Sequence, residues 1–396
     1  MTTCTIRSRR TTHRLLPLAA LLAAHSVFAQ SSVTLYGVAD DGIAYVNNSR
    51  GAARTYMRAG NLSTSKFGLT GSEDLGGGLQ AIFQLEAGFD LNTGAASSAG
   101  LLFNRQAFVG LRSRSAGTLT LGRQYTPYYL FIGPYTGSNW LTGATGAHPG
   151  DIDGLDSSFR INNAVSYVSP TVSGVTVGLL YGVGGIPGSA GRGQSLSAAV
   201  KYENGPLGIG AGYLRMDNAG LASGFDSAST ASIPNSSVNT GYVSARSIQH
   251  AAIAANYRLG DLVLGLNYSN VRYAPGHKSL FANTAMFNTY GALAVYSFTP
   301  AFSIGGGYSY TLASKANGVA SPARYQQIAL KESYSLSKRT TLYALQAYTH
   351  AAGQTLGAAG APQVVDAVAL VGDSQNSTPS SNRNQLAVML GLTVRF

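Results

Sequence analysis

The sequence predicts an all-β fold, a 16-stranded antiparallel transmembrane β-barrel with an inward-folded third loop. Strand-like runs recur along the chain, and short turns alternate with long connections. After residue 29 no apolar run reaches the length of a membrane-spanning helix. Only 11% of the 396 residues are charged, whereas a soluble domain carries about 25%. Because only helices and closed barrels satisfy their backbone in lipid, these observations favour a barrel.

Residues 1–29 are predicted to be a signal peptide. Four arginines precede the apolar run Leu15–Ala24, and the stretch ends on the small residue Ala29. The apolar run is too short to cross about 30 Å of hydrocarbon as a helix. Cleavage before Gln30 removes Cys4, the only cysteine, so we expect no disulfide and no thiolate metal site in the barrel, residues 30–396.

The charge balance of the chain argues against a nucleic-acid partner. Removing 29 residues and four arginines from 396 residues with 27 basic and 16 acidic side chains leaves 367 residues and a net charge of +7. A nucleic-acid-binding protein clusters its Lys and Arg in runs or stripes. Here they are scattered singly, so we expect no nucleic acid among the partners.

Alternation with a period of two identifies the strands. From Leu262 to Ser269, Leu and Tyr occupy one face and mostly small or polar residues the other, which is typical of an outer-membrane strand. The same pattern recurs in sixteen runs: 33–45, 64–72, 79–90, 103–113, 118–125, 160–169, 174–182, 195–203, 207–215, 247–258, 262–271, 287–298, 302–312, 325–336, 341–349 and 384–396. Sixteen strands, an even number, suit a bacterial barrel.

The connections between these runs alternate in length. Seven are short, at 72–78, 115–117, 170–173, 204–206, 259–261, 299–301 and 337–340. Eight are long, at 46–63, 91–102, 126–159, 183–194, 216–246, 272–286, 313–324 and 350–383. In a barrel the long connections lie outside and both termini lie on the short-turn side. A soluble sandwich or propeller is the alternative, but neither requires all long connections on one side.

The third long connection, Thr126 to Ser158, has neither a helical nor a strand period. Connections of this length are usually functional or disordered. Inside a wide barrel such a segment can fold inward and narrow the lumen. We therefore expect it to set the narrowest section of a pore.

The last strand carries an independent signal. Apolar residues alternate from Leu386 to the terminal Phe396. A terminal strand that ends in Phe resembles the signal read by the outer-membrane assembly machinery. Alternatively, Phe396 only joins the aromatic girdle at the membrane interface.

Several motifs resemble one known family. Ser32–Asp40, Ser65–Gln80, Asn104–Leu111, Leu121–Tyr125 and the terminal Phe look like the trimeric general porins of Gram-negative outer membranes, of the β-proteobacterial type. The resemblance implies a homotrimer in the outer membrane, surrounded by its lipids and lipopolysaccharide. It also implies an inward third loop and passive diffusion of small hydrophilic solutes and ions.

Strand phase predicts that three cations line the lumen: Lys66, Arg105 and Arg160. The residues used as outward markers are Phe67 and Leu69 for Lys66, Phe108 for Arg105, and Ile161 and Val165 for Arg160. The resemblance places the three cations on the basic side of the porin constriction. The alternative for a scattered charge is a structural ion pair.

An acidic side of the constriction is predicted less directly. Phase points Asp40 and Glu86 inward, and Asp151, Asp153 and Asp156 come late in the third connection, where they could face the cations. Asp-rich loop ends also make turns through their own backbone, which is the alternative.

Three further charges fall on the outward phase of their strands. Arg123 is in phase with Leu119 and Leu121, and a charge on the lipid face costs about 2–4 kcal/mol. We therefore expect Arg123 at a subunit interface. Asp41 is expected at the rim or the interface, and Glu332, in phase with outward residues, has no explanation from the sequence.

The sequence favours a channel over an enzyme. After residue 29 there is no His-x-x-x-His pair, no Gly-x-Ser-x-Gly elbow and no Cys, so we expect no catalysis, no cofactor and no metal. An esterase with Ser and His on different strands would need no motif, so the missing motifs do not exclude one. We predict an outer-membrane porin with a mild anion preference. A substrate-specific channel, or a barrel whose outer loops act as adhesin or receptor, would also fit the sequence.

Overall fold

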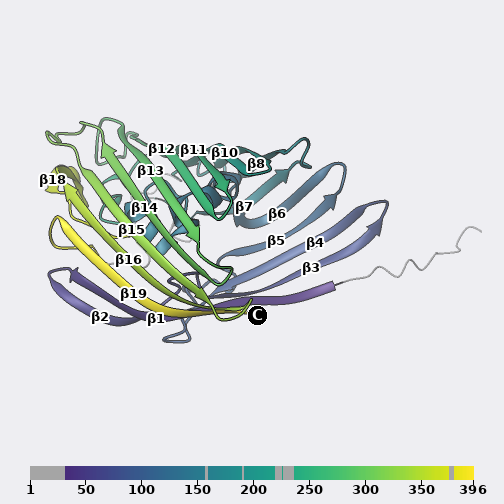
Figure 1. Cartoon of the computed structure of the whole chain (residues 1–396). Helices are drawn as coiled ribbons and strands as arrows, with labels where there is room; N and C mark the ends of the chain where they lie inside the picture. The colour runs from purple at the N-terminus through teal and green to yellow at the C-terminus, as the bar shows by residue number, and fades with distance from the viewer. Residues whose placement is uncertain (1–31, 157–158, 190, 219–224, 226–235, 374–378) are drawn as a thin grey trace, which may run out of the picture.

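The computed structural model describes residues 32–156, 159–189, 191–218, 225, 236–373 and 379–396. The predicted signal peptide and its cleavage site lie outside the described residues. Seventeen of the described strands form one closed antiparallel barrel (Figure 1). The wall strands are β1 Ser32–Ser49, β2 Ala52–Ala59, β3 Lys66–Gly76, β4 Leu79–Gly88, β5 Gln106–Ser113, β6 Gly117–Tyr125, β7 Arg160–Val168, β8 Val175–Gly182, β9 Ser195–Asn204, β10 Leu207–Asp217, β11 Ser247–Leu259, β12 Leu262–Ala274, β13 Ala285–Ser297, β14 Phe302–Ala313, β15 Arg324–Ser335, β16 Thr340–Ala352 and β19 Asn384–Arg395.

Sixteen wall strands result when β2 and β3 are counted as two halves of one strand. The N-terminal part of β1, from Ser32 to Val38, pairs with β3, and its C-terminal part, from Asp41, pairs with β2. The other edge of β1 pairs with β19, from Val38 opposite Arg395 to Val46 opposite Ala387, which closes the barrel. The predicted number of strands and their antiparallel order are confirmed.

The predicted alternation is visible in the exposure of the wall. On β12, Leu264 and Leu266 are exposed, while Val263, on the opposite face of the strand, is buried. In an isolated chain an exposed apolar row on a closed barrel is the surface that faces lipid. Leu and Tyr side chains therefore cover the outside, and the inner face meets the lumen and the connections that enter it.

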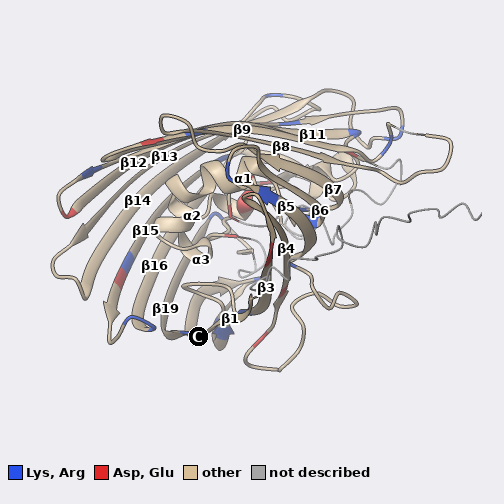
Figure 2. Ribbon diagram, turned by 90° about the vertical axis from the view of Figure 1, so that its right-hand side faces the viewer, with Lys and Arg blue, Asp and Glu red and all other residues tan. Residues whose placement is uncertain are grey.

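The third connection folds into the barrel, as expected, through short helical pieces. These are α1 Pro127–Ile132, η2 Gly133–Tyr135, α2 Gly137–Trp140, α3 Gly143–Gly146 and η3 Pro149–Asp151. Figure 2 shows α1, α2 and α3 inside the ring of strands. Thr126 caps α1 by accepting a hydrogen bond from the N–H of Tyr129 at 3.2 Å, and Pro127 fits the first turn, where no N–H is needed. No helix among the described residues is long and apolar enough to cross a membrane.

Glycines in the wall let the third connection approach closely. An added Cβ at Gly210 of β10 would collide with the backbone carbonyl oxygen of Phe131 in α1. Gly208 on the same strand faces the ring of Tyr135 in the same way. Because a side chain at either position would push the helices away from the wall, these glycines fix the depth of the connection.

Two connections predicted as loops are partly strand. Within 46–63, β1 continues to Ser49 and turns directly into β2. Within 350–383, β17 Gln354–Gly357 and β18 Gly360–Asp366 form a second small sheet. The loop predictions for these stretches are wrong because a composition of Gly, Ala, Ser and Asn does not separate a hairpin from a loop.

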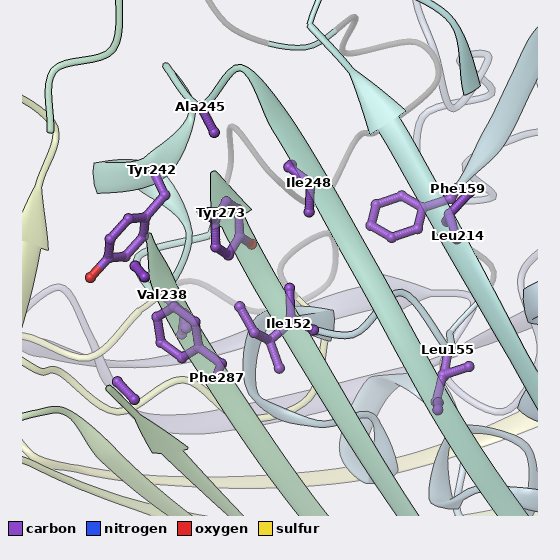
Figure 3. Close-up of a cluster of buried hydrophobic side chains, with 14 of the residues drawn as sticks. Ile152, Leu155, Phe159, Leu214, Val238, Tyr242, Ala245, Ile248, Tyr273 and Phe287 are labelled. Atoms are coloured by element: carbon purple, nitrogen blue, oxygen red, sulfur yellow. The ribbon is translucent and has the colours of Figure 1, made fainter. Parts of the chain in front are cut away.

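Connections pack as a hydrophobic cluster over the inner wall of β10–β14 (Figure 3). Ile152 and Leu155 of the third connection meet wall residues there, among them Leu214 and Ile248. The ring of Tyr242, in η4 Thr240–Tyr242, lies 5.2 Å from that of Tyr273 and 5.5 Å from that of Phe287. The long connections that cover the inner face of β10–β14 therefore share one apolar core with these strands.

A second hydrophobic cluster anchors the tip of the third connection. Leu141 and Ala144 pack with Val295 of β13, Leu345 of β16 and Met389 of β19. The connection leaves the wall at β6 and therefore spans the lumen to strands on the other side. The basic residues described next lie on the remaining part of the wall, between β3 and β7.

Candidate pore constriction

Three cations and one carboxylate meet on the inner wall between β3 and β7. Lys66 begins β3, Arg105 precedes β5 and Arg160 begins β7. Glu86, near the end of β4, accepts a hydrogen bond from Nε of Arg105 at 2.8 Å, and Nζ of Lys66 lies 3.4 Å from its other oxygen. Tyr36 also donates to Glu86, at 2.9 Å. The carboxylate is therefore surrounded by donors that favour its ionised form.

Tyr125 joins the two arginines. Nη2 of Arg160 donates to the Tyr125 hydroxyl at 3.2 Å. The guanidinium carbons of Arg160 and Arg105 lie 5.1 Å and 5.8 Å from the centre of the Tyr125 ring, within the range of cation–π contact. Tyr129 of α1 packs against the same ring, 5.2 Å between centres. Sequence reasoning missed this tyrosine, although its place at the end of the Leu121–Tyr125 motif, next to the third connection, was a usable signal.

The cluster carries a net positive charge. Lys66, Arg105 and Arg160 against Glu86 give three positive charges and one negative charge, a balance of +2. Glu86 thus lies among the cations. Its predicted place on an opposite, acidic side is wrong because β4 is a direct neighbour of both β3 and β5.

Two residues that were predicted to point outward, Phe108 and Ile161, point inward. On β5, Val109 pairs with outward Leu121, and Phe108 pairs with Gly122, so Phe108 faces the lumen. On β7, Ile161 is buried in the inner hydrophobic cluster. Asn163, with φ of 50°, and a register shift against β6 reverse the phase there. Arg105 and Arg160 reach the cluster because they stand at strand starts, where local contacts and not the pleat orient them.

Arg123 does not point outward. Only 9% of it is exposed, and its Nε donates to the carbonyl oxygen of Asn104 at 2.7 Å. The same guanidinium donates to the side chain of Asn162. The pairing of β6 with β7 is irregular between Gly122 and Gln124, where β7 carries one extra residue, and Gly122 has a φ of 135°, so the pleat does not fix the direction of the Arg123 side chain. The outward placement is therefore wrong, and the interface role inferred from it loses its basis.

Asp40 faces inward but serves the wall itself. Its carboxylate accepts hydrogen bonds from the backbone N–H groups of Asn61 at 2.7 Å and of Leu62 and Ser63 at 3.3 Å each. The hydroxyl of Tyr343 donates at 2.9 Å. Asp40 is fully buried, so its predicted place on the surface of the constriction is wrong. Instead it holds residues 60–65, where the chain leaves the wall between β2 and β3.

The three aspartates of the third connection have separate surroundings. Asp153 is buried and bonds to Nδ1 of His148 and to the hydroxyl of Ser269, both at 2.6 Å, which fastens the connection to β12. Burial raises the pKa of Asp153, but His148 and Ser269 outweigh this, and the pKa lies below its ordinary value. Asp151 is buried and accepts from the N–H of Asp156 at 3.1 Å. Only Asp156 is partly exposed.

Phe396 completes the closure of the barrel. Its N–H donates to the carbonyl oxygen of Gly37 at 3.1 Å, and its own carbonyl oxygen accepts from the N–H of Gly37 at 3.0 Å. Its ring lies over Gly37, where an added Cβ would collide with it. Among the described residues no group of three His, Cys, Asp or Glu side chains is arranged to hold a metal ion.

Comparison with known proteins identifies relatives that match between about half and 70% of this chain. The outer membrane porin protein 32 of Delftia acidovorans is 38% identical over 232 residues, 54% of this chain and 62% of that protein. An outer membrane porin protein of Bordetella pertussis is 35% identical over 49% of this chain and 57% of that protein. The chain therefore spans less than two thirds of these two relatives. The major outer membrane protein P.IB of Neisseria meningitidis serogroup B is 30% identical over 319 residues, 70% of this chain and 86% of that protein.

Solved structures share the fold. The anion-selective porin from Comamonas acidovorans superposes with a TM-score of 0.69 at 24% identity, covering 93% of this chain and 100% of that one. OmpT of Vibrio cholerae in its trimer form gives 0.63 at 15% identity, with coverage of 92% and 99%. The relatives are outer membrane proteins, and together with the apolar outer face they locate this barrel in the outer membrane. The family model of the Gram-negative porins matches residues 18–354, and the chain belongs to this family.

Proposed function

We propose that this protein is a water-filled channel for passive diffusion of small hydrophilic solutes and ions, with a mild preference for anions. The observation that carries the proposal is the +2 cluster of Lys66, Arg105, Arg160 and Glu86 on one side of the lumen, beside the inward third connection. A narrow section lined by positive charge raises the local concentration of anions. The related fold of a porin described as anion-selective supports the proposal.

The nearby acids do not cancel this charge. Asp40 and Asp153 are buried and bonded to neutral donors and to His148, respectively. Asp156 is partly exposed and lies near enough to Arg160 for the charge of that residue to lower its pKa, against the larger effect of burial, which raises it. The preference should therefore be modest. It should fade as salt approaches about 1 M, where the Debye length falls to about 3 Å.

The test is the reversal potential of the purified protein in planar bilayers under a KCl gradient. We expect open channels whose reversal potential shows chloride passing more readily than potassium at low salt. Strong cation selectivity at low salt would contradict the anion preference. Absence of any conductance from folded, inserted protein would contradict the channel itself.

A channel specific for one class of solute is the second candidate, and Tyr125 favours it. Two guanidinium groups fixed 5.8 Å and 5.1 Å from the centre of one ring hold two positive charges close together, which suits an organic anion. Such a channel would show conductance that saturates with the solute or is blocked by it. Conductance proportional to salt concentration, without block, supports the general channel.

We further propose that the protein is a homotrimer and that its outer face over β1, β15, β16 and β19 forms the subunit contact. Asp41 and Glu332 lie on this face among apolar side chains such as Ile43, Leu342 and Leu390. Gln346 donates to Glu332 at 3.0 Å, which only partly satisfies the carboxylate. Contact with another subunit would remove both acids from hydrocarbon, where charge is costly.

The location of the barrel in the outer membrane implies three further partners: lipids, lipopolysaccharide and the assembly machinery. The apolar outer face outside the subunit contact would meet outer-membrane lipids and lipopolysaccharide. Phe396, exposed at the end of β19, would be the residue read by the outer-membrane assembly machinery. Deleting Phe396 tests this role: we expect less protein in the outer membrane, whereas unchanged assembly would contradict it.

A further inference from the structure

The last long connection enters the lumen and is fastened to the third. Ala367, Ala369, Leu370 and Val371 are fully buried. The N–H of Gly150 donates to the carbonyl oxygen of Gly372 at 2.8 Å, and the N–H of Asp373 donates to that of Gly143 at 3.1 Å. Residues 367–373 therefore lie against the third connection as a second inward segment.

Gln327 of β15 holds both connections. Its Nε2 donates to the carbonyl oxygens of Thr145 at 3.0 Å and Ala147 at 2.7 Å in the third connection. Its Oε1 accepts from the N–H of Gly372 at 3.0 Å in the last connection. These bonds are made by uncharged groups and so persist at any ordinary pH. Ionisable groups also meet at the edge of this junction.

At that edge two carboxyl groups face each other. The side chain of Asp156 hydrogen-bonds to that of Asp373, and Asp151 lies close enough to act on Asp156 through its charge. A hydrogen bond between two carboxyl groups requires that one of them carries a proton. Burial, then the charges of Asp373 and Asp151, raise the pKa of Asp156 well above its ordinary value, in agreement with this arrangement.

Two arginines flank the carboxyl pair. Arg160 of β7 acts on Asp156, and Arg58 of β2 acts on Asp373 through its charge. Arg58 is 5% exposed, and its Nε and Nη2 have no hydrogen-bond partner among the described residues. Arg58 is therefore a buried cation with free donors on the Asp373 side of the junction.

We infer that Asp156 and Asp373 form a proton-dependent latch between the third and the last connection. With one shared proton the two segments are held together across the lumen. Without it, two carboxylates repel each other, and Asp373 is attracted to the free donors of Arg58. The Asp373 side chain then moves from Asp156 toward Arg58, while Gln327 keeps the rest of segment 367–373 in place, and the lumen widens at the carboxyl pair. This inference rests on the proposed channel function.

The test is single-channel conductance between about pH 4 and about pH 9, a range that covers the ordinary and the raised pKa of a carboxyl group. Because the pKa of Asp156 is raised, the latch is closed at low pH and opens as the pH rises through that value. Wild-type conductance should therefore increase in one step with pH.

Two variants test the carboxyl pair directly. Asp156→Asn and Asp373→Asn should each stay at the low-pH conductance throughout, because an amide donates to the remaining carboxyl group without a titratable proton. Asp261→Asn, in the short turn after β11, should keep the wild-type step.

The outcomes separate the latch from the channel. A conducting wild type without a pH step overturns the latch and leaves the channel intact, whereas absence of conductance at every pH contradicts the channel. A step that survives in both Asn variants also overturns the latch. Trp140, the only tryptophan, lies in the third connection and reports on it without substitution. Its fluorescence should shift at the same pH as the conductance, and an unchanged spectrum would overturn the latch even if a variant fails to fold.

Discussion

The charged side chains of the lumen have two different roles. Some act on passing solutes, and others stabilise the fold. Lys66 keeps about a quarter of its side chain exposed, while Glu86, its partner, is almost fully buried. Arg105 and Arg160 are only 5% and 6% exposed and are fixed by Glu86 and Tyr125, so they act on passing ions through their electric field and not by direct contact. Fixed cations favour anions without a large reorganisation as each ion passes.

Charge reversal at the arginines tests their position. Arg105→Glu or Arg160→Glu changes the local charge by two units, so the reversal potential in a KCl gradient should move toward cations. Arg160→Glu should keep more of the fold, because Arg105→Glu would set two carboxylates against each other at Glu86. Arg339→Glu, in the exposed turn before β16, makes the same change outside the lumen and should leave the reversal potential unchanged. Two lumen variants without a shift would remove these arginines from the constriction.

Asp40 should affect stability and not selectivity. Asp40→Ala leaves the N–H groups of Asn61, Leu62 and Ser63 without their acceptor, and an unsatisfied buried group costs about 1–3 kcal/mol. We expect a lower free energy of unfolding in urea, measured in detergent or lipid vesicles, with an unchanged reversal potential. Asp74→Ala, at an exposed position near the end of β3, is the matched control and should have little effect on either quantity. A selectivity change in Asp40→Ala would return this carboxylate to the pore surface.

Strand phase placed Lys66 on the inner face of β3, which is regular there with outward Phe67 beside it, and Lys66 contacts Glu86 on the neighbouring strand. Strand phase failed for Arg123 and Ile161, which lie at the irregular pairing of β6 with β7. It also failed for Phe108, where β5 is regular but the neighbouring apolar residue, Val109, is the outward one. A bulge adds one residue and so reverses every later side chain. No composition signal marks such a bulge, so phase cannot be carried through a strand end from sequence alone.

Among the structural elements, the third connection contains a segment that can be deleted without separating the chain ends on either side of it. The backbones of Gly137 and Gly146 are in contact, so residues 137–146, about ten, can be removed with little strain at the joint. This segment crosses the lumen to pack on β13, β16 and β19. Its removal should therefore raise single-channel conductance. A deletion of similar length in the exposed second connection, residues 91–102, should not. Unchanged conductance in a folded 137–146 deletion would show that another part of the wall sets the narrowest section.

Apart from β2, β17 and β18, which fall in stretches predicted as loops, the strands were predictable to within a few residues, since each of them carries eight or more residues of alternation. The helices of the third connection were not, because pieces of three to six residues are too short to show a helical period. The inward course of residues 367–373 was not predicted either. It depends on backbone hydrogen bonds to another connection, and backbone groups leave no trace in the sequence.

At the scale of the whole molecule, the residues on the outer face differ between two parts of the barrel, and this difference indicates what each part contacts in the membrane. Leu266 on β12 and Leu390 on β19 are both highly exposed leucines of the same outward phase. Near Leu390 the face also carries Asp41 and Glu332, whereas Leu266 lies among Ile253, Tyr268 and Tyr290. A uniform lipid contact does not account for acids on one side alone.

This asymmetry gives a matched test of the subunit contact. Leu→Arg on a lipid-facing strand costs about 2–4 kcal/mol near the bilayer midplane, so Leu390→Arg and Leu266→Arg carry a similar insertion cost. If the face of β1, β15, β16 and β19 joins the subunits, Leu390→Arg should convert trimers into monomers, because the new cation is buried against a second chain. Leu266→Arg should remain trimeric. The measurement is the mass of the detergent-solubilised protein by light scattering. Trimers that survive Leu390→Arg and dissociate with Leu266→Arg would place the contact on β11–β13 instead.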